Sequence, residues 1–394
     1  MRARGAVAFG TALVACLCLG LWLGGHPSRL PGPLRDAFVS EPAGVAAEAA
    51  QAIEGRYFRD VDRERLGDAS VQGMARELRR RYRDRFTEYI PPSHLAAFSE
   101  QIEGRFSGVG LSVVPVRAGL RVVRAFPGSP ARRAGVRPGE TIVSVDGRSI
   151  AGLPSTKATA LIKGPEGTEV RLGVRGAGGE REVRVRRAEV TVPNVTAQLA
   201  RARGRRLAYV HLASFSRTAH GQLGRALRRL LRRGAEGIVL DLRGNPGGLL
   251  QEAVLTAGLF LPEGSVVVRT VSRSEGDTVY RTGGGALPRR PLAVLIDRGT
   301  ASAAEILAAA LADDAGALVV GTRSFGKGLF QQEARLGNGG ALKLTVGEYF
   351  TPKGKNLAET KGIHPRIRVA DSPRTPRDEA KQRALDALAA RLGR

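Results

Sequence analysis

Cysteine is nearly absent from this chain of 394 residues: the only two, Cys16 and Cys18, lie in an apolar run near the N-terminus. No disulfide therefore holds the long segment that follows them. Aromatic residues make up only 5% of the chain, and no motif for reading nucleic acid is visible. The net charge of +25 comes from scattered arginines, so we expect no nucleic-acid partner and at most a weak attraction to anionic lipid headgroups.

Histidine and lysine are also scarce, with five and eight residues respectively. Arginine, which supplies the other basic residues, stays protonated and cannot act as a general base. No histidine follows an expected strand beside a serine and a carboxylate, and we expect His211, the best placed of them, to be a packing or surface residue. A serine hydrolase built from this chain would therefore need a desolvated lysine as its base.

Only one long apolar run is present, over residues 6–25 after Arg2 and Arg4. It is long enough to cross a bilayer, and its positive flank favours a cytoplasmic N-terminus. Because no clear cleavage site follows, we expect an uncleaved signal anchor over residues 1–25 in a bacterial inner membrane, with the rest of the chain in the periplasm or extracytoplasmic space. The sequence LVAC that ends at Cys16 leaves lipidation of that cysteine open.

The length predicts two to three domains, and composition divides the chain after the anchor into five segments. These are a Pro- and Gly-rich linker over 26–40, a helical region over 41–103, a half-β module over 104–188, an α/β core over 189–370 and a helical tail over 371–394. In the helical region, Leu78, Tyr82, Phe86 and Tyr89 recur at helical spacing before Pro91. We expect this stripe to pack against its own region or a second copy of the chain.

The two central segments, residues 104–188 and 189–370, differ in the pattern of their apolar residues. Short β-type runs dominate the first, at 109–116, 120–125, 141–145, 169–174 and 182–186, with one helix at 155–162. In the second, strands at 207–212, 237–242, 292–297 and 317–321 alternate with helices at 221–233, 249–260 and 303–312. This alternation predicts a layered α/β fold with functional groups at the strand ends. A last helix at 379–392 is expected to be peripheral.

The first turn that could carry chemistry is DLRGNPGG, residues 241–248, between a buried strand and a helix. Its glycines can expose backbone N–H groups at a helix N-terminus, which suits an anion or a developing oxyanion. A plain strand-to-helix turn would have the same pattern.

The second turn is GTASAAE, residues 299–305. Ser302 with Glu305 has the spacing of a capping box, and most such pairs only cap a helix. The same geometry presents a serine hydroxyl at the sheet edge, where the N–H of Ala303 and the helix dipole can stabilise negative charge.

The third turn contains Gly326-Lys327-Gly328. The spacing from Gly321 to Lys327 fits a phosphate-binding loop, but Gly328 stands where a Ser or Thr should bind magnesium, and residues 329–336 alternate like a strand. A nucleotide hydrolase is therefore disfavoured. Lys327 is the natural candidate for the base, and Gln331 could orient its amine if the chain bends between them.

At these residues the sequence resembles the C-terminal processing peptidases, or tail-specific proteases, of the S41 serine peptidase family. DLRGNPGG, GTASAAEI, GTRSFGKGLFQ and YFTPKGKNL occur in the family's order and at its usual spacing. The resemblance implies Ser302 as nucleophile, Lys327 as general base and Gln331 as the residue that positions the lysine. It also implies an oxyanion hole formed by the N–H groups of Gly248 and Ala303.

Residues 104–188 resemble the family's PDZ domain, inserted between the helical region and the protease core. The resemblance implies a loop that binds a peptide carboxylate, formed by Phe106, Ser107, Gly108, Val109 and Gly110. It assigns Lys163 a part in sensing the bound peptide. The chain departs from the family at Arg366, where an acidic residue is usual, and at Ala304, often a serine; neither change bears on the chemistry.

We therefore expect a membrane-anchored serine endopeptidase that cleaves protein substrates near their free C-termini through an acyl-enzyme, without a cofactor or metal. The alternative is a catalytically inactive PDZ adaptor that binds protein C-termini.

Overall fold

The computed structural model describes residues 41–285, 287–371, 375 and 377–393. The expected anchor, the linker and both cysteines lie outside these residues. Among the described helices, none is both long and apolar enough to cross a membrane. The described chain forms two compact units, residues 41–91 with 336–342 and residues 92–335 with 343–393.

The first unit contains α3 (Glu41–Arg56), α4 (Arg63–Tyr82) and the short strand β1 (Glu88–Ile90). The hydroxyl of the buried Tyr89 contacts the carboxylate of Asp68 and accepts a hydrogen bond of 2.7 Å from the Asn338 amide. These polar contacts join β1 to α4 and to the 336–342 turn.

The expectation of one helical stripe from Leu78 to Tyr89 is wrong. Helix α4 ends at Tyr82 because Arg83 adopts a left-handed conformation, with φ of 55°. The Asp84 carboxylate then accepts from the N–H groups of Phe86 and Thr87, which fixes a turn. The aromatic side chains therefore separate: Tyr82 is 68% exposed, whereas Tyr89 is buried.

In the second unit, the half-β module has the sheet order β3-β4-β5-β7-β8, with β6 on β5. The strands are β3 (Leu111–Val116), β4 (Gly119–Ala125), β5 (Thr141–Val145), β6 (Arg148–Ser149), β7 (Glu169–Gly176) and β8 (Gly179–Arg186). Two helices, α6 (Pro130–Arg133) and α7 (Ser155–Ile162), accompany them around an apolar core of their own. The module is entered from α5 (Pro92–Glu103) through β2 (Arg105–Gly108), which pairs antiparallel with the exit strand β9 (Ala188–Thr191).

The α/β core is a six-stranded sheet in the order β10-β11-β12-β15-β16-β19. The strands are β10 (Val195–Ala202), β11 (Arg205–Leu212), β12 (Gly237–Asp241), β15 (Leu292–Ile296), β16 (Leu318–Gly321) and β19 (Ile367–Arg368). All neighbours are parallel except β10 and β11. The turns that follow β12, β15 and β16 therefore lie at one edge of the sheet, as the sequence predicts.

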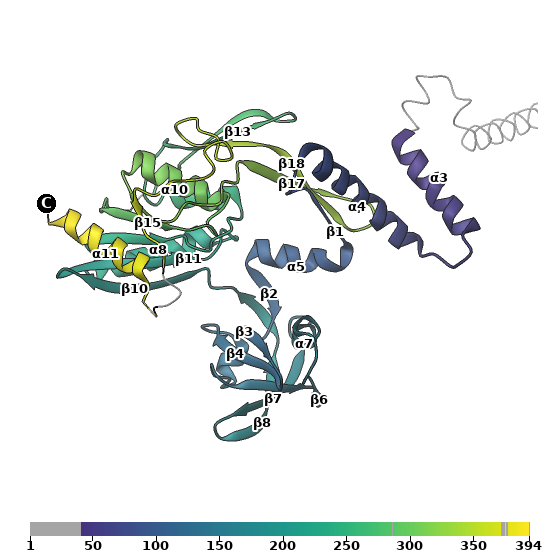
Figure 1. Cartoon of the computed structure of the whole chain (residues 1–394). Coiled ribbons are helices and arrows are strands. Elements are labelled where there is room, and N and C mark those ends of the chain that lie inside the picture. The colour runs from purple at the N-terminus through teal and green to yellow at the C-terminus, as the bar shows by residue number, and fades with distance from the viewer. Residues whose placement is uncertain (1–40, 286, 372–374, 376, 394) are drawn as a thin grey trace, which may run out of the picture. The chain divides into compact units, whose positions relative to one another are not determined.

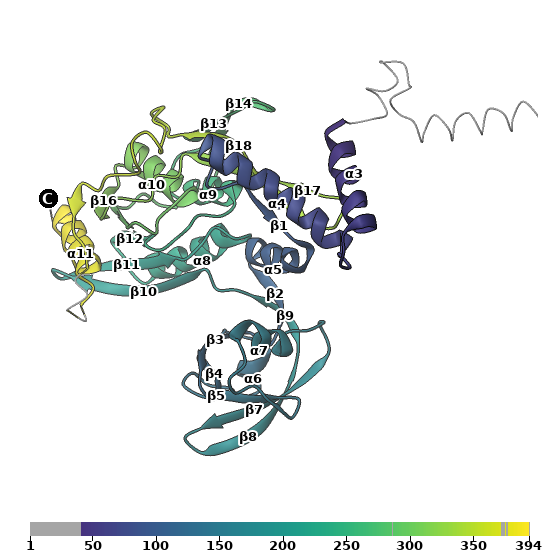
Figure 2. The ribbon, with the colours of Figure 1, turned by 45° about the vertical axis from the view of Figure 1, so that its right-hand side comes forward.

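Helices cover both faces of this sheet (Figures 1 and 2). On one face α8 (Ala219–Arg232), α9 (Leu250–Ala257) and α10 (Ala303–Asp314) pack against alternate strand residues such as Leu240 and Val294. On the other face, α11 (Glu379–Leu392) buries Leu385 and Leu388 against Val239 and its neighbours. The expectation that this last helix is peripheral is wrong, because its apolar stripe closes the second face of the core.

A further sheet carries one strand whose alternation the sequence analysis recognised, at residues 329–335, and others that it did not identify as elements. It contains β13 (Val266–Ser272), β14 (Gly276–Arg281), β17 (Leu329–Arg335) and β18 (Ala341–Phe350). Strand β17 continues directly from the Lys327 turn, and β18 returns antiparallel to β13. This sheet therefore brings residues of the YFTPKGKNL segment back to the turns at the edge of the core.

Candidate active site

Backbone and side-chain hydrogen bonds join the three turns. The Thr300 hydroxyl donates to the Leu242 carbonyl at 2.8 Å, and the Ala301 N–H donates to the Asn245 carbonyl at 3.0 Å. The Phe325 N–H in turn donates to the Thr300 carbonyl at 3.0 Å. Segments that are more than fifty residues apart in the chain are thus held as one constellation.

Ser302 occupies the sharp turn from β15 into α10. Its φ of 55° and ψ of −122° are unusual for a residue with a side chain, as expected for a serine on a strained strand-to-helix turn. Gly247 packs directly against it: a Cβ at that position would lie 2.9 Å from Ser302 Cβ and 2.8 Å from the Ala301 carbonyl oxygen. The first and second turns touch through this glycine.

Glu305, which the sequence suggests only as a capping residue, is the centre of the site. Its carboxylate is fully buried and accepts four hydrogen bonds. One oxygen, Oε2, accepts from the backbone N–H groups of Ser302 and Lys327, both at 2.9 Å. The other, Oε1, accepts from the Ser324 hydroxyl at 2.5 Å and the Gly326 N–H at 2.7 Å. The nitrogens of Ser302 and Lys327 are therefore separated by no more than twice 2.9 Å.

The Lys327 side chain lies against Gln331 at the start of β17. Its Nζ donates to Gln331 Oε1 at 2.6 Å, and Gln331 Nε2 donates to Thr345 Oγ1 on β18 at 3.3 Å. The bend that the sequence analysis required between Lys327 and Gln331 is thus present.

The proposed oxyanion donors belong to the two other turns. Gly248 has φ of 143°, and a Cβ there would lie 2.5 Å from the Phe215 carbonyl oxygen, so only glycine fits this turn. Ala303 opens α10 directly after Ser302. Within the described part of the chain, neither the Gly248 nor the Ala303 N–H donates to a protein acceptor. Both donors remain available to a ligand.

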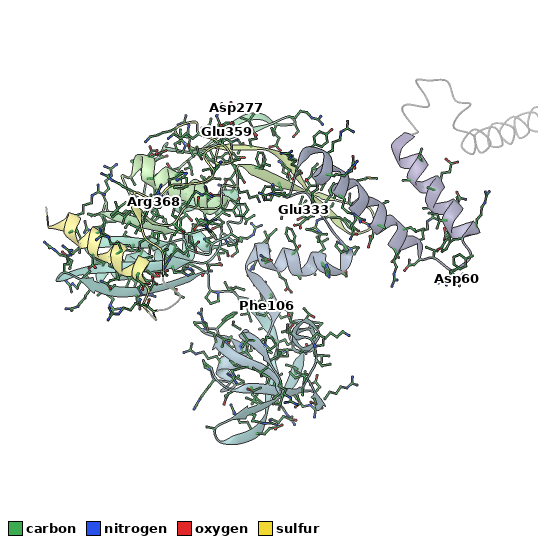
Figure 3. All side chains as sticks on the ribbon, viewed as in Figure 1. Asp60, Phe106, Asp277, Glu333, Glu359 and Arg368 are labelled. Carbon is green, nitrogen blue, oxygen red and sulfur yellow. The ribbon has the colours of Figure 1, made fainter. Side chains whose placement is uncertain are left out.

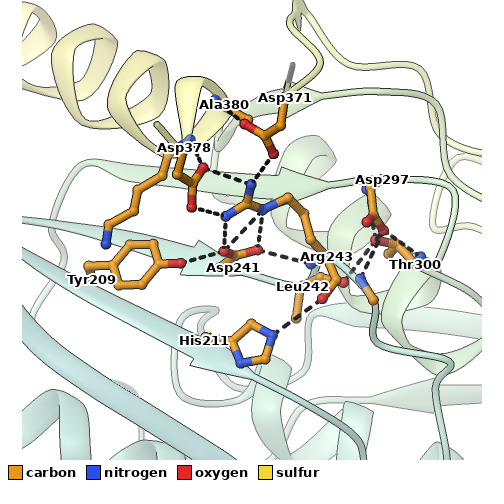
Figure 4. Close-up of polar contacts among 12 residues, drawn as sticks. Tyr209, His211, Asp241, Leu242, Arg243, Asp297, Thr300, Asp371, Asp378 and Ala380 are labelled. Atoms are coloured by element: carbon orange, nitrogen blue, oxygen red, sulfur yellow. Dashed lines mark hydrogen bonds and ion pairs between the residues drawn. The ribbon is translucent and has the colours of Figure 1, made fainter. Parts of the chain in front are cut away.

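An ionic cluster that runs from the buried Asp241 to the exposed Asp371 and Asp378 ties the first turn to α11 (Figure 4). The Arg243 guanidinium donates to Asp241 at 2.6 Å, to Asp371 at 2.8 Å and to Asp378, the N-cap of α11, at 2.9 Å. Burial, aided by the negative charge of Asp241, raises the pKa of the Tyr209 hydroxyl, which donates to that carboxylate at 2.5 Å. Sequence reasoning missed this cluster because its members come from four separate segments.

The five residues expected to bind a carboxylate lie partly in strand β2 and partly in the connection that follows it. Phe106, Ser107 and Gly108 lie in β2 and pair with β9, whereas Val109 and Gly110 form the bend before β3. Strand β3 is the first strand of its sheet, so its outer side has no partner strand among the described residues. An exposed edge of this kind can accept an extended peptide.

Lys163 lies next to this loop, at the end of α7. Its ammonium is 5.2 Å from the centre of the Phe106 ring, which Figure 3 labels, and it forms an ion pair with Glu100 of α5. The Ser107 hydroxyl donates to the carbonyl of the next residue, Gly164, at 2.7 Å.

Comparison with known proteins matches residues 206–369 to peptidase family S41 and residues 121–176 to the PDZ domain. The carboxyl-terminal-processing protease of Synechocystis is 38% identical over 315 residues, covering 77% of this chain and 73% of that protein. The carboxy-terminal processing protease CtpA of Bacillus subtilis is 33% identical over 341 residues, covering 86% and 70%. Among solved structures, the photosystem II D1 C-terminal processing protease is 28% identical, with a TM-score of 0.51, covering 89% of this chain and all of that one.

The matched family ranges lie inside the segments that the sequence analysis assigned to the core and the PDZ domain; the outer boundaries of those segments remain predictions. With two relatives above 30% identity over most of their length, the chain belongs to the S41 peptidase family as a serine-type peptidase of the carboxy-terminal processing group that carries a PDZ domain.

Proposed function

We propose that this protein is an endopeptidase that cuts protein substrates near their C-termini, with Ser302 as nucleophile, Lys327 as general base and Gln331 as the residue that positions the base. One observation carries the proposal: a single buried carboxylate, that of Glu305, receives the N–H groups of both Ser302 and Lys327. Lysine and serine are thereby held on neighbouring turns of one rigid site.

The chemistry follows from these groups. Neutral Lys327 takes the proton from Ser302 Oγ while Oγ attacks the scissile carbonyl carbon, and the resulting oxyanion binds the N–H groups of Gly248 and Ala303. The lysine ammonium then protonates the leaving amine as the tetrahedral intermediate collapses to an acyl-enzyme. Water, deprotonated by the same lysine, releases the new C-terminus.

The PDZ domain is proposed to capture the substrate C-terminus by strand addition to β3, with the carboxylate at the loop that ends in Val109 and Gly110. A peptide substrate with an amidated C-terminus should then be cleaved less efficiently than the same peptide with a free carboxylate. Equal efficiency would contradict this part of the proposal without affecting the assignment of Ser302.

The central test uses two variants and one control, assayed on a protein substrate with a free C-terminus. Ser302→Ala and Lys327→Ala should each abolish cleavage while far-UV circular dichroism and thermal unfolding stay unchanged. Lys355→Ala, which removes an exposed lysine, should cleave as the wild type does. Retained cleavage by purified Ser302→Ala would refute the mechanism. If a serine-reactive phosphonate fails to label the wild type, the inactive PDZ adaptor is favoured instead.

Location and assembly extend the proposal. The apolar run over 6–25 would anchor the chain in the inner membrane with the protease outside the cytoplasm, and separation of membranes from soluble extract, followed by protease protection, tests this. The helices of the first unit expose Val45, Met74 and Tyr82, and the turn between them exposes Phe58, which favours a pairing of two copies through this region. Light scattering of a chain that begins after residue 91 should then report a smaller assembly than light scattering of the longer chain.

A further inference from the structure

One part of the PDZ domain carries arginines without any acidic residue. Residues 104–139, which form β2, β3, β4 and α6, contain seven arginines and no aspartate or glutamate. The first of them, Arg105, forms ion pairs with Glu103 and Glu189 outside this stretch. The other six are all exposed, and we call them the arginine surface: Arg117, Arg121, Arg124, Arg132, Arg133 and Arg137.

No carboxylate neutralises the arginine surface. Within the described part of the chain, none of its six guanidinium groups forms an ion pair, and the next acidic residue, Glu140, is already paired with Arg181 at 2.8 Å. The rest of the domain differs, because residues 140–188 contain six acidic residues against nine basic ones. There Arg175, for example, pairs with Glu180 at 3.0 Å. The uncompensated charge of the domain therefore gathers on β3, β4 and α6.

Three of these arginines share a pocket. Arg124, Arg132 and Arg137 line a hollow of about 490 Å³ between the end of β4 and α6, and its other lining residues are apolar or glycine. A guanidinium group binds a phosphate through two parallel N–H···O bonds, and it keeps its charge at any physiological pH. Three such groups around one hollow suit the phosphate of a lipid headgroup.

Apolar side chains are exposed beside the arginines. Val114 of β3 is 43% exposed and lies directly opposite Arg121 of β4, so both side chains are on the same face of the hairpin. Val123 of β4 is 51% exposed. Apolar groups next to basic ones are typical of surfaces that lie in the headgroup region of a bilayer. A nucleic acid would instead need aromatic side chains for stacking, and the domain has only Phe106 and the buried Phe126.

We propose that the arginine surface binds the phosphate groups of anionic phospholipids and so holds the PDZ domain on a bilayer. The inference goes beyond the proposed function, because it concerns a surface that takes no part in the chemistry of Ser302. Each arginine near an anionic bilayer adds only a modest attraction, which salt screens. The expected anchor over residues 1–25 would keep the domain close to the same bilayer, and this proximity raises the effective concentration of headgroups.

The test compares hydrogen exchange of the backbone amides of the full chain in two kinds of lipid nanodisc. One kind contains phosphatidylcholine alone, and the other contains phosphatidylcholine and phosphatidylglycerol in equal parts. The discs are in excess, so the comparison does not require the apolar run to insert. A triple variant of the pocket carries Arg124→Gln, Arg132→Gln and Arg137→Gln. The control variant removes the same charge from exposed arginines elsewhere in the domain, with Arg148→Gln, Arg171→Gln and Arg184→Gln. Equal Tm values show that both variants fold as the wild type does.

In the wild type and the control variant, exchange over residues 117–124 and 131–137 should be at least about threefold slower with the anionic discs, and exchange over 177–184 should not change. The difference should vanish in the pocket variant, and in the wild type at about 1 M salt, where the Debye length is about 3 Å.

Equal exchange of the wild type with both kinds of disc would overturn the inference. A difference that persists in the pocket variant, or that is lost equally in the control variant, would do the same. Glycerol phosphate or polyglutamate is also added to the discs of phosphatidylcholine alone. If either slows exchange as much as the anionic discs do, the surface binds a free phosphate or an acidic polypeptide, and docking on a membrane is wrong.

Discussion

Replacing Glu305 with glutamine tests whether one carboxylate assembles the active site. The two side chains have nearly the same shape, so the substitution creates no cavity and changes only charge and hydrogen bonding. A carboxylate accepts at both oxygens, whereas an amide accepts at one and donates at the other. Whichever way the amide turns, its NH₂ group faces two donors that now contact Oε1 or Oε2.

The magnitude follows from those four contacts. If the NH₂ group takes the place of Oε2, the N–H groups of Ser302 and Lys327 both lose their acceptor; if it takes the place of Oε1, the N–H of Gly326 loses its acceptor and the Ser324 hydroxyl must turn away. Each buried donor left unsatisfied costs about 1–3 kcal/mol, so the variant should lose about 2–6 kcal/mol of stability in the first orientation and about 1–3 kcal/mol in the second. The two turns should also separate, and kcat should fall by at least about 100-fold.

The assay combines kcat for a peptide substrate with Tm from circular dichroism. The kcat values are measured at a temperature below the Tm of the variant, so that all molecules are folded. Glu359→Gln is the control, because it removes the same charge from an exposed turn, labelled in Figure 3, and should change neither value. A Glu305→Gln protein with the kcat and Tm of the wild type would show that the carboxylate does not hold the site together.

Two further predictions concern the first turn. Gly247→Ala should abolish cleavage and phosphonate labelling, because its Cβ would lie 2.8 Å from the Ala301 carbonyl oxygen and 2.9 Å from Ser302 Cβ; normal labelling would contradict the packing described here. Asp378→Asn keeps an N-cap side chain but removes the charge that Arg243 binds. In the wild type, burial raises the pKa of the Asp378 carboxyl, but the hydrogen bonds and charge of Arg243 outweigh burial and hold this pKa below 3.8. A carboxyl whose pKa is lower in the folded than in the unfolded state stabilises the fold at pH values above its unfolded pKa. This stabilisation is lost as the pH falls through the folded pKa. The Tm difference between wild type and Asp378→Asn should therefore be present at neutral pH and shrink below pH 3.8; a difference that grows on acidification would contradict the sign.

The parts of the fold that the sequence predicts are those where local pattern and final structure agree. Helix α7 and strand β5 have the expected bounds because Pro154 precedes the one and short apolar alternation defines the other. Strands β12 and β15 are continuous apolar runs bounded by turns, as buried parallel strands should be. Strands β12 and β15 lead directly into the first two turns, so the approximate position of the site is predictable.

The elements that were missed have mixed patterns. Strands β13 and β14 form a hairpin in which Arg269 pairs with Val279, so neither strand alternates cleanly between apolar and polar residues. Helix α11 has charged residues over much of its surface, and only the tertiary structure shows that Leu385 and Leu388 face the sheet. A single helix period cannot distinguish an exposed amphipathic helix from one that closes a core.

The same distinction applies to the site. Its individual residues are predictable because each turn has a local signature, but the contacts between turns are not, since no sequence period links Glu305 to Lys327. Glu305 illustrates the limit: the capping pattern correctly predicts its bond to the Ser302 N–H, yet its second bond, to the Lys327 N–H, depends on the return of a segment twenty-two residues later.

The choice of a buried carboxylate for this junction has a physical reason. Apolar packing would hold the turns together but would allow small sliding motions, whereas hydrogen bonds restrict both distance and angle. Ser302 also has a positive φ that costs about 1–3 kcal/mol, and a bond to its own N–H is the direct way to offset that strain. Because the oxygen that holds the Ser302 N–H also holds the Lys327 N–H, strain at the serine and placement of the lysine are parts of one equilibrium. A substitution that relaxes the backbone strain at Ser302 must therefore also displace Lys327.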